Sequence, residues 1–278
     1  MVGDILASSR RIRRKRFILK ASLILLFILI LLGGVIGFFH TPKFRIREIS
    51  VEGTISLEQE QFKRETQKFL EGKYFKIFPY DNIFILPEGK MAVELSEKFP
   101  LLKKIVIKHD FSQKLSVAVE ERKAKALWCG QLDFVSEAER LCAFLDETGF
   151  IFQPAPNFSG AIFLKFFDER KEPASPSQGG PSGIGKMMID PAEFKKIYLF
   201  AELLAKKEFA IAKIILKDAG IYEFYLKDDW YILLNDKNEP SQAFSNLELV
   251  LEQTIKEKRS KIEYIDLRFG KKVFYKLK

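Results

Sequence analysis

FILKASLILLFILILLGGVIGFF, residues 17–39, contains 23 residues and a single charged side chain, Lys20. As an α-helix this stretch would be about 34 Å long, and the hydrocarbon core of a bilayer is about 30 Å thick. Lys20 lies near the basic end of the stretch, where its long side chain can reach the headgroups. The stretch therefore predicts a transmembrane helix over residues 17–39.

A cleavable signal peptide is the alternative, because it also begins with basic residues and then becomes apolar. Its apolar core usually has about 7–15 residues and ends in a cleavage site made of small residues. The present stretch is longer, and Val35-Ile36-Gly37 is a poor cleavage sequence. We therefore expect a retained anchor that follows a basic tail over residues 1–16.

Charges on either side of this stretch predict its orientation. Seven Lys or Arg lie between positions 10 and 20, whereas the three that follow the stretch are accompanied by two glutamates. The positive-inside rule then keeps residues 1–16 in the cytoplasm and places everything after His40 outside it. We expect a single-pass protein of the cytoplasmic membrane whose C-terminal part is extracytoplasmic.

The net charge of +9 comes mainly from the N-terminal segment. Residues 1–43 hold eight Lys or Arg and one Asp, and the other 235 residues hold 38 basic and 36 acidic side chains. The body of the protein is therefore nearly neutral, and nucleic acid is not expected as a partner. With 47% hydrophobic and 30% charged residues, the composition is typical of folded domains.

GPSGIGKM, residues 180–187, has the G-x-x-x-x-G-K spacing of a phosphate-binding loop. Such a loop also needs Ser or Thr after the lysine, a strand before it and a helix after it. Met187 occupies the Ser or Thr position, and the preceding EPASPSQGG is typical of flexible loops. We predict no nucleotide site, and a flexible loop over about residues 172–186.

Residues 44–122 predict a small α+β unit. Apolar residues alternate in FRIREISVEG, which predicts a strand, and a change of phase within it indicates a bulge or burial on both faces. Apolar residues at helical spacing then predict two helices, and two short strands follow. The expected elements, in the order β-α-α-β-β, are a strand at 44–53, helices that start near Ser56 and Pro87, and strands at 102–107 and 114–121.

Residues 123–278 predict a mostly antiparallel β-sheet with two helices, which makes the whole chain an α+β protein. Asp190-Pro191-x-Glu193 is a helix start, because Asp caps the first turn and Pro fits its first position. Gly270-Lys271 predicts a tight hairpin turn, since glycine readily adopts a positive φ. Strands are expected at 129–134, 141–152 with a turn at 146–149, 211–216, 222–226, 230–234, 262–269 and 272–277, and the second helix starts near Phe244.

Cys129 and Cys142 are the only cysteines of the chain. Both would lie outside the cytoplasm, where disulfides form, and on neighbouring predicted strands. A structural zinc site usually has four ligands, so this pair would need His109 and a carboxylate as well. We predict a disulfide between the two, with a pair of buried thiols as the alternative.

Catalytic motifs are not recognisable in the sequence. The two histidines, His40 and His109, stand in no motif with a nucleophile. Most of the 37 carboxylates alternate with lysine, which is typical of solvated surfaces. We predict no enzymatic activity, no metal site and no cofactor, and a carboxylate site assembled by the fold is the alternative.

The order of these parts resembles the FtsQ/DivIB family of cell-division proteins. In that family a basic tail and a single span precede a POTRA (polypeptide-transport-associated) domain, which residues 44–122 resemble from FRIREISVEG to VEERKAKALW. The similarity covers residues 10–278 in order. Ala124 stands where the family usually has proline, and the segment from Glu172 to Lys186 resembles an insertion relative to the family's pattern.

Two further motifs carry the resemblance into residues 123–278, which correspond to the family's β-domain. FLDETGFIF is similar to the family's D-x-x-G turn, with Asp146, Gly149 and Phe152 at the matching positions. KIEYIDLRFGKKVFYK is similar to the family's closing Y-(I/V)-D-L-R segment, which starts here at Tyr264.

The resemblance implies a non-enzymatic scaffold of the divisome. Proteins of this family use the POTRA domain for recruitment to the division site and the β-domain to bind the small bitopic proteins FtsB and FtsL, or DivIC. They help to control septal peptidoglycan synthesis. The family docks its partner near the segment that matches Arg268, Phe269 and Gly270, and the predicted partner-binding residues are Tyr264, Arg268, Phe269, Gly270, Val273 and Tyr275.

The residues themselves also favour such binding. A hairpin at the edge of a sheet exposes N–H and C=O groups to which a partner strand can add. Alternation along the penultimate strand predicts that Tyr264 and Arg268 share one face, whereas Phe269 shares the other face with core residues. The alternative is that Phe269 and Val273 simply fill the core.

Two other classes of function are alternatives. A membrane-anchored envelope hydrolase would need a deep cleft with two close acids of perturbed pKa, whereas a shallow edge-strand surface favours the scaffold. A POTRA-type transport chaperone would be expected to have several tandem modules or a membrane barrel. The sequence predicts one module and no lipid-facing barrel strands.

Overall fold

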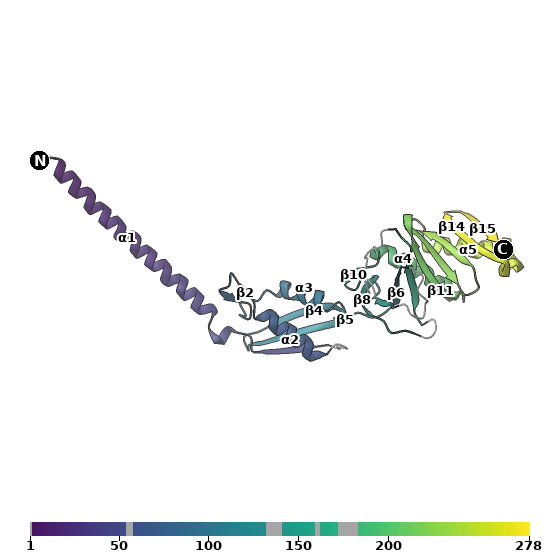
Figure 1. Ribbon diagram of the computed structural model, residues 1–278, viewed down its shortest axis with the longest axis horizontal. Coiled ribbons are helices and arrows are strands. Elements are labelled where there is room, and N and C mark those ends of the chain that lie inside the picture. The colour runs from purple at the N-terminus through teal and green to yellow at the C-terminus, as the bar shows by residue number, and fades with distance from the viewer. Residues whose placement is uncertain (1, 54–57, 132–140, 159–161, 172–182) are drawn as a thin grey trace. The chain divides into compact units, whose positions relative to one another are not determined.

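The computed structural model describes residues 2–53, 58–131, 141–158, 162–171 and 183–278 (Figure 1). Two compact units make up the chain. We call Met1–Lys98 with Lys104–Glu120 the N-terminal unit, and Phe99–Lys103 with Glu121–Lys278 the C-terminal unit. The fold is α+β, with one long apolar helix near the N-terminus and a large, mostly antiparallel sheet.

Helix α1, Val2–Phe39, opens the N-terminal unit. Within it, Lys15–Phe39 is the one segment of the described residues that is long and apolar enough to cross a membrane. Large apolar side chains from Phe17 to Phe38 are exposed along this segment. A helix of this kind near the N-terminus fits a single membrane span or a signal sequence.

After α1, the main elements of the N-terminal unit follow the predicted order β-α-α-β-β, with a short hairpin between the helices. They are β1 Glu48–Glu52, α2 Gln59–Leu70, β2 Lys73–Tyr74, β3 Phe78–Pro79, α3 Glu88–Lys98, β4 Leu102–His109 and β5 Lys114–Glu121. The three long strands form a sheet of order β1-β5-β4, in which β1 and β5 are parallel, and β2 pairs with β3. Phe62 and Met91 from the helices and Leu115 from β5 are fully buried.

The first strand is shorter than predicted. Pro42–Phe44 form a 3-10 turn instead, because proline fixes φ near the helical value. Arg45 then makes an isolated bridge to Asn82, and the strand begins at Glu48. The predicted capping residue Ser56 lies outside the described residues.

A ten-stranded sheet organises the C-terminal unit. Its strands are β6 Ala126–Gln131, β7 Ala143–Leu145, β8 Phe150–Pro154, β9 Leu164–Asp168, β10 Lys186–Met187, β11 Ile211–Lys217, β12 Ile221–Leu226, β13 Tyr231–Asn235, β14 Ile262–Phe269 and β15 Lys272–Leu277. They lie in the order β10-β8-β7-β6-β9-β11-β12-β13-β14-β15. Three neighbouring pairs are parallel, namely β6 with β9, β9 with β11 and β13 with β14, and the other pairs are antiparallel.

Strand β9 is absent from the strands predicted by sequence, yet it joins the two halves of the sheet. Phe166 pairs with Trp128 on β6 and with Ile214 on β11. Phe166 and its neighbour Phe167 are both buried. The adjacent phenylalanines, both buried, break the alternation by which the other strands were predicted.

Two helices pack on one face of the sheet, α4 Pro191–Lys206 and α5 Pro240–Val250. The predicted start of α4 is confirmed, because Asp190 Oδ1 accepts hydrogen bonds from the backbone N–H groups of Ala192 and Glu193. Buried residues of both helices share a core with alternate residues of the strands. After α5 the chain makes a π-helical turn and a 3-10 segment that ends at β14.

The predicted loop over residues 172–186 lies mostly outside the described residues. At its end, Lys186 and Met187 form β10, which pairs with Ile151 and Phe150 of β8. Lys186 is therefore followed by an extended segment rather than by the helix that a phosphate-binding loop requires.

A disulfide joins Cys129 on β6 to Cys142, the residue that precedes β7. The register of β6 and β7 pairs Trp128 with Ala143, so the two cysteines are directly opposite each other. Their Cα atoms are 4.2 Å apart. A separation of about 4.5 Å is usual for antiparallel pairs that are not hydrogen-bonded to each other.

Asp146 organises the turn between β7 and β8. Its Oδ1 accepts the backbone N–H groups of Thr148 and Phe150 at 2.8 and 3.0 Å, and its Oδ2 pairs with Arg122. Burial would raise the pKa of Asp146, but these hydrogen bonds and that of the Thr148 hydroxyl outweigh burial and hold the pKa below its usual range. The buried carboxylate is therefore charged at neutral pH.

Candidate partner-binding edge

Strand β15 is the last strand in the order of the large sheet, so β14 is its one neighbour among the described residues (Figure 1). Both strands are drawn in yellow at the C-terminal end of the chain. The outer side of an edge strand presents backbone N–H and C=O groups that no strand of the same sheet pairs. The structure thus provides the open edge that the sequence predicts.

The hairpin between β14 and β15 turns at Gly270-Lys271, as predicted. Gly270 has a φ of +65°, which suits a two-residue hairpin turn that starts with glycine. The Gly270 carbonyl accepts a hydrogen bond from Asn246 Nδ2 of α5 at 2.8 Å. Helix α5 therefore fixes the position of the turn, a role for Asn246 that the sequence did not reveal.

Phe269 does not share the buried face of β14, contrary to the prediction. Ile265 and Leu267 are buried, but Phe269 is 56% exposed. Between Asp266 and Phe269 the register shifts by one residue, and Phe269 lies opposite Lys272. This irregularity changes which face the following side chain occupies, so Phe269 leaves the core side.

Three aromatic side chains are exposed on this hairpin, and we call them the edge aromatics: Phe269, Phe274 and Tyr275. Phe274 is 52% exposed and Tyr275 is 42% exposed. The rings of Phe269 and Phe274 meet edge to face, with centroids 5.2 Å apart. Phe274 pairs with Asp266 and Tyr275 with Ile265, so the two β15 aromatics project to opposite faces. Phe274 is not among the residues predicted from the sequence, although two adjacent aromatics in a strand place one ring on each face.

Arg268 lies beside the edge aromatics. Its guanidinium carbon is 5.6 Å from the centre of the Phe269 ring. The same guanidinium holds the Asp266 carboxylate with two hydrogen bonds, of 2.9 and 2.7 Å. These hydrogen bonds raise the pKa of Arg268 above its ordinary value. Asp266 is itself buried, so Arg268 neutralises it while covering one side of the Phe269 ring.

Tyr264 lies further along β14, opposite Lys276 rather than at the turn. Its ring packs against Tyr231 of β13 with centroids 5.6 Å apart, and Tyr231 stacks on Tyr225 of β12 at 5.0 Å. The Tyr225 hydroxyl donates a 2.9 Å hydrogen bond to Glu223. Burial, followed by the hydrogen bond to Glu223, raises the pKa of Tyr225 well above its ordinary value. Tyr264 therefore belongs to a row of tyrosines across the sheet.

Val273 is partly buried and packs against the main core under the helices. The core-filling alternative thus applies to Val273 and is wrong for Phe269. Of the predicted residues, the structure brings Arg268, Phe269 and Gly270 together at the turn. Tyr275 is exposed on the same strand as Val273.

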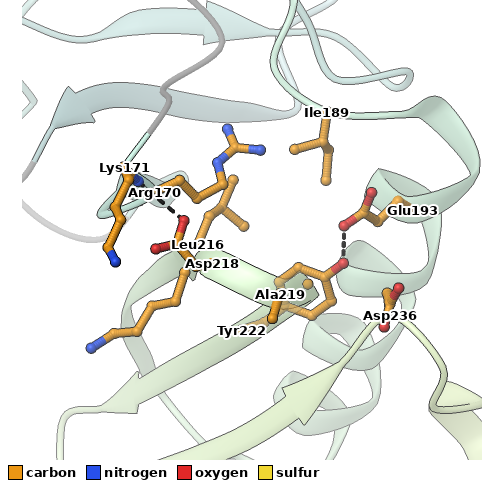
Figure 2. A pocket seen from close by; sticks show the side chains of 11 residues that line it. Arg170, Lys171, Ile189, Glu193, Leu216, Asp218, Ala219, Tyr222 and Asp236 are labelled. Atoms are coloured by element: carbon orange, nitrogen blue, oxygen red, sulfur yellow. Dashed lines mark hydrogen bonds between the residues drawn. The ribbon is translucent and has the colours of Figure 1, made fainter.

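A separate polar cavity of about 540 Å³ lies elsewhere in the C-terminal unit (Figure 2). Figure 2 shows Glu193 of α4 pointing at Tyr222 of β12, whose hydroxyl donates a hydrogen bond to it. Burial and this hydrogen bond raise the pKa of Tyr222 far above its ordinary value, so the hydroxyl keeps its proton. Asp218 accepts the backbone N–H of Lys171 at 3.1 Å. Each of these two carboxylates therefore connects neighbouring elements of the fold, instead of forming a pair with the other.

Among the residues that the structure describes, no group of three or more His, Cys, Asp or Glu side chains is arranged to hold a metal ion. Comparisons with models of protein families and with curated proteins find no match for this chain.

Proposed function

We propose that this chain is a bitopic scaffold of the cell-division machinery, similar to FtsQ/DivIB proteins, that captures small bitopic partners of the FtsB/FtsL or DivIC kind on strand β15. The observation that carries the proposal is a six-residue edge strand with exposed aromatic rings on both faces. An exposed edge strand is a template for pairing with another chain, and neighbouring exposed apolar side chains mark an interaction site.

In this proposal α1 crosses the cytoplasmic membrane once, and residues 44–122 act as a POTRA domain just outside it. The exposed apolar surface of Lys15–Phe39 supports the span, and the basic residues that precede it support a cytoplasmic N-terminus. The disulfide between Cys129 and Cys142 fits an oxidising compartment outside the cytoplasm.

Strand addition explains how the edge would bind. A partner strand beside β15 would pair with the outward N–H and C=O groups, which supplies affinity for any extended backbone. Side chains of the partner that alternate across the new strand pair would meet Phe274 on one face and Tyr275 on the other. Covering a half-exposed aromatic ring contributes about 1–2 kcal/mol, so the edge aromatics would select apolar partner residues.

The envelope-hydrolase alternative would place its chemistry in the polar cavity. There, Glu193 accepts a hydrogen bond from Tyr222, and Asp218 caps the backbone at Lys171. Both contacts are those of structural carboxylates, which favours the scaffold over a carboxylate-based hydrolase.

Hydrogen exchange on the full chain in lipid nanodiscs tests the proposal. The chain is measured alone and with an FtsB/FtsL-type pair from the same organism. We expect amides of β15 to exchange at least about tenfold more slowly in the complex, because a partner strand would protect them. Amides of the central strands β11 and β12 serve as the internal control, since they are paired on both sides already.

A complex that forms without slower exchange in β15 would contradict strand addition at this edge. Absence of any complex with FtsB/FtsL-type or DivIC-type proteins would contradict the division function.

A further inference from the structure

A group of aromatic side chains, in contact with one another, lies at the C-terminal end of α1. Phe38 of α1 contacts Phe44 and Phe84, with centroids 5.1 and 5.7 Å apart. Phe84 in turn contacts Phe111, in the turn between β4 and β5, at 6.0 Å. Phe111 is 76% exposed, and Phe38 and Phe84 are about half exposed. So much exposed aromatic surface in one place marks an interaction site.

The hairpin between β2 and β3 adds a second apolar element. Its tip is Phe75-Lys76-Ile77, and the Phe75 ring is 88% exposed. Phe75 also has a positive φ of 49°, a conformation that is costly for a bulky side chain. Phe75 lines an apolar hollow with Phe39 and Phe78, yet most of its ring stays in solvent, which points to a contact outside this unit.

These residues are tied to the end of α1 by direct contacts. The Phe39 ring at the end of α1 lies 5.5 Å from Phe78 of β3. Asn82 Nδ2 donates to the Phe39 carbonyl at 2.9 Å, and Gln113 Nε2 donates to the Pro42 carbonyl at 2.6 Å. The aromatic rings are therefore continuous with the apolar surface of the helix.

Charges around these residues suit a lipid headgroup region. Lys43, Lys73 and Lys76 are exposed between the aromatic residues. Of the nearby acids, Asp81 pairs with Arg45 at 2.6 Å and Asp110 accepts hydrogen bonds from Ser112. Aromatic rings with lysines beside them are the composition of membrane interfaces, where rings sit at headgroup level and ammonium groups meet phosphates.

We infer that Phe75 and Ile77 of the β2–β3 tip, together with Phe84 and Phe111, insert into the headgroup region of the bilayer that α1 crosses. This second contact rests on the proposed function, since it requires α1 to lie in the membrane. It would hold the N-terminal unit against the bilayer surface by two attachments, a helix and a hairpin.

Tryptophan fluorescence of the full chain in vesicles tests the inference. Phe75→Trp places the probe at the tip, and Val93→Trp is the matched control, because Val93 is a 57% exposed apolar residue on α3. The native Trp128 and Trp230 are buried in the C-terminal unit and give the same background in both variants. Phe111→Trp gives a second probe in case the tip substitution disturbs folding.

In vesicles of brominated phosphatidylcholine with phosphatidylglycerol, we expect quenching of the Phe75→Trp probe about twofold stronger than of the Val93→Trp probe, because bromine quenches only rings within the bilayer. Equal, weak quenching of the Phe75→Trp, Phe111→Trp and Val93→Trp probes overturns the inference. Fluorescence of the Phe75→Trp probe that brominated lipid leaves unchanged, but that an added division partner alters, would also overturn the inference, in favour of a protein contact.

Extraction with alkaline carbonate separates this inference from the proposed function. A chain that stays in the membrane pellet with an unquenched tip contradicts the inference alone. A chain released into the supernatant contradicts the membrane span itself, and with it the proposed function.

Discussion

Arg268 folds back along β14 and binds the carboxylate of Asp266, two residues earlier, through Nε and Nη2 at 2.9 and 2.7 Å. Arg170 binds Asp168 in the same way at the end of β9, with distances of 2.8 and 2.9 Å. Both aspartates are buried, and both strands have a parallel neighbour. An Asp-x-Arg pair thus neutralises a buried carboxylate at two places in one sheet.

Replacement of Arg268 should destabilise the C-terminal unit, and the loss should be larger when both its charge and its hydrogen bonds to Asp266 are removed. Arg268→Ala leaves Asp266 buried without its partner and should lower the free energy of unfolding by about 3 kcal/mol. Arg268→Lys keeps the charge but cannot form the bidentate pair, and should lower the free energy of unfolding by about 1–2 kcal/mol. Urea unfolding measures both, with Lys271→Ala in the exposed turn as the control. Equal stability of Arg268→Ala and Lys271→Ala would contradict a structural role for the pair.

A negative charge among the edge aromatics should weaken partner capture. Phe269→Glu and Tyr275→Glu each place a carboxylate where the proposal puts apolar partner side chains. We expect the Kd for an FtsB/FtsL-type pair to rise at least about tenfold while the Tm changes little, because both side chains are exposed. Leu199→Glu on α4 is the matched control, as Leu199 is an exposed apolar residue of the same unit. An unchanged Kd for both edge variants would place the binding site elsewhere.

Acid should destabilise the C-terminal unit partly through Asp146. Its pKa is lower in the folded chain than in the unfolded chain, so its contribution is complete above the unfolded pKa and is lost as pH falls through the folded pKa. Between about pH 6 and about pH 3 the parent should lose more stability than Asp146→Asn, which has no such proton to take up. Urea unfolding across this range measures the difference. Parallel pH curves for the two proteins would refute the assignment.

A methyl group at position 149 should disrupt the turn that Asp146 organises. Gly149 has a φ of +81°, and a Cβ there would lie 2.9 Å from the Phe194 ring. Gly149→Ala should therefore lower the free energy of unfolding by about 2 kcal/mol or more. Gly89→Ala is the matched control, because Gly89 lies in α3 with open space around it, and it should stabilise its helix by about 0.5–1 kcal/mol. Effects of the same sign would contradict this account.

The disulfide should be present in the mature protein and should stabilise the C-terminal unit. It joins residues 13 apart, and a loop of this size contributes about 3 kcal/mol when the unfolded chain is constrained. Non-reducing peptide mapping should recover Cys129 and Cys142 as one linked pair, and reductant should lower the Tm. Recovery of two free thiols would contradict the predicted disulfide.

Elements with a local signal were predictable from the sequence. Asp190-Pro191 begins α4 because a carboxylate caps free N–H groups in any context. Gly270 makes the final hairpin because its turn needs a positive φ. Periodicity with capping and proline signals predicts the order of the main elements in the N-terminal unit, although not the β2–β3 hairpin. Each of these features depends on residues that are close together in the sequence.

Features that depend on distant neighbours were not predictable in the same way. Strand β9 owes its place to pairing with β6 and β11, which its own five residues cannot specify. Phe269 is exposed because the pairing of β14 with β15 shifts by one residue, and alternation cannot reveal such a shift. Asn246 reaches the hairpin from another helix. The candidate edge was located by the sequence, but its exposed residues were determined by the register.

The two ends of the large sheet are unequal, since β10 has two residues and β15 has six. Because only one of these two end strands is long, each molecule can accept a single added strand at β15. Two β15 strands paired across a twofold axis would cover each other, so a second copy of the chain and the proposed partner strand could not occupy this side together. Self-association through β15 would therefore compete with the proposed capture of a partner, and the balance between them would shift with the concentration of the chain.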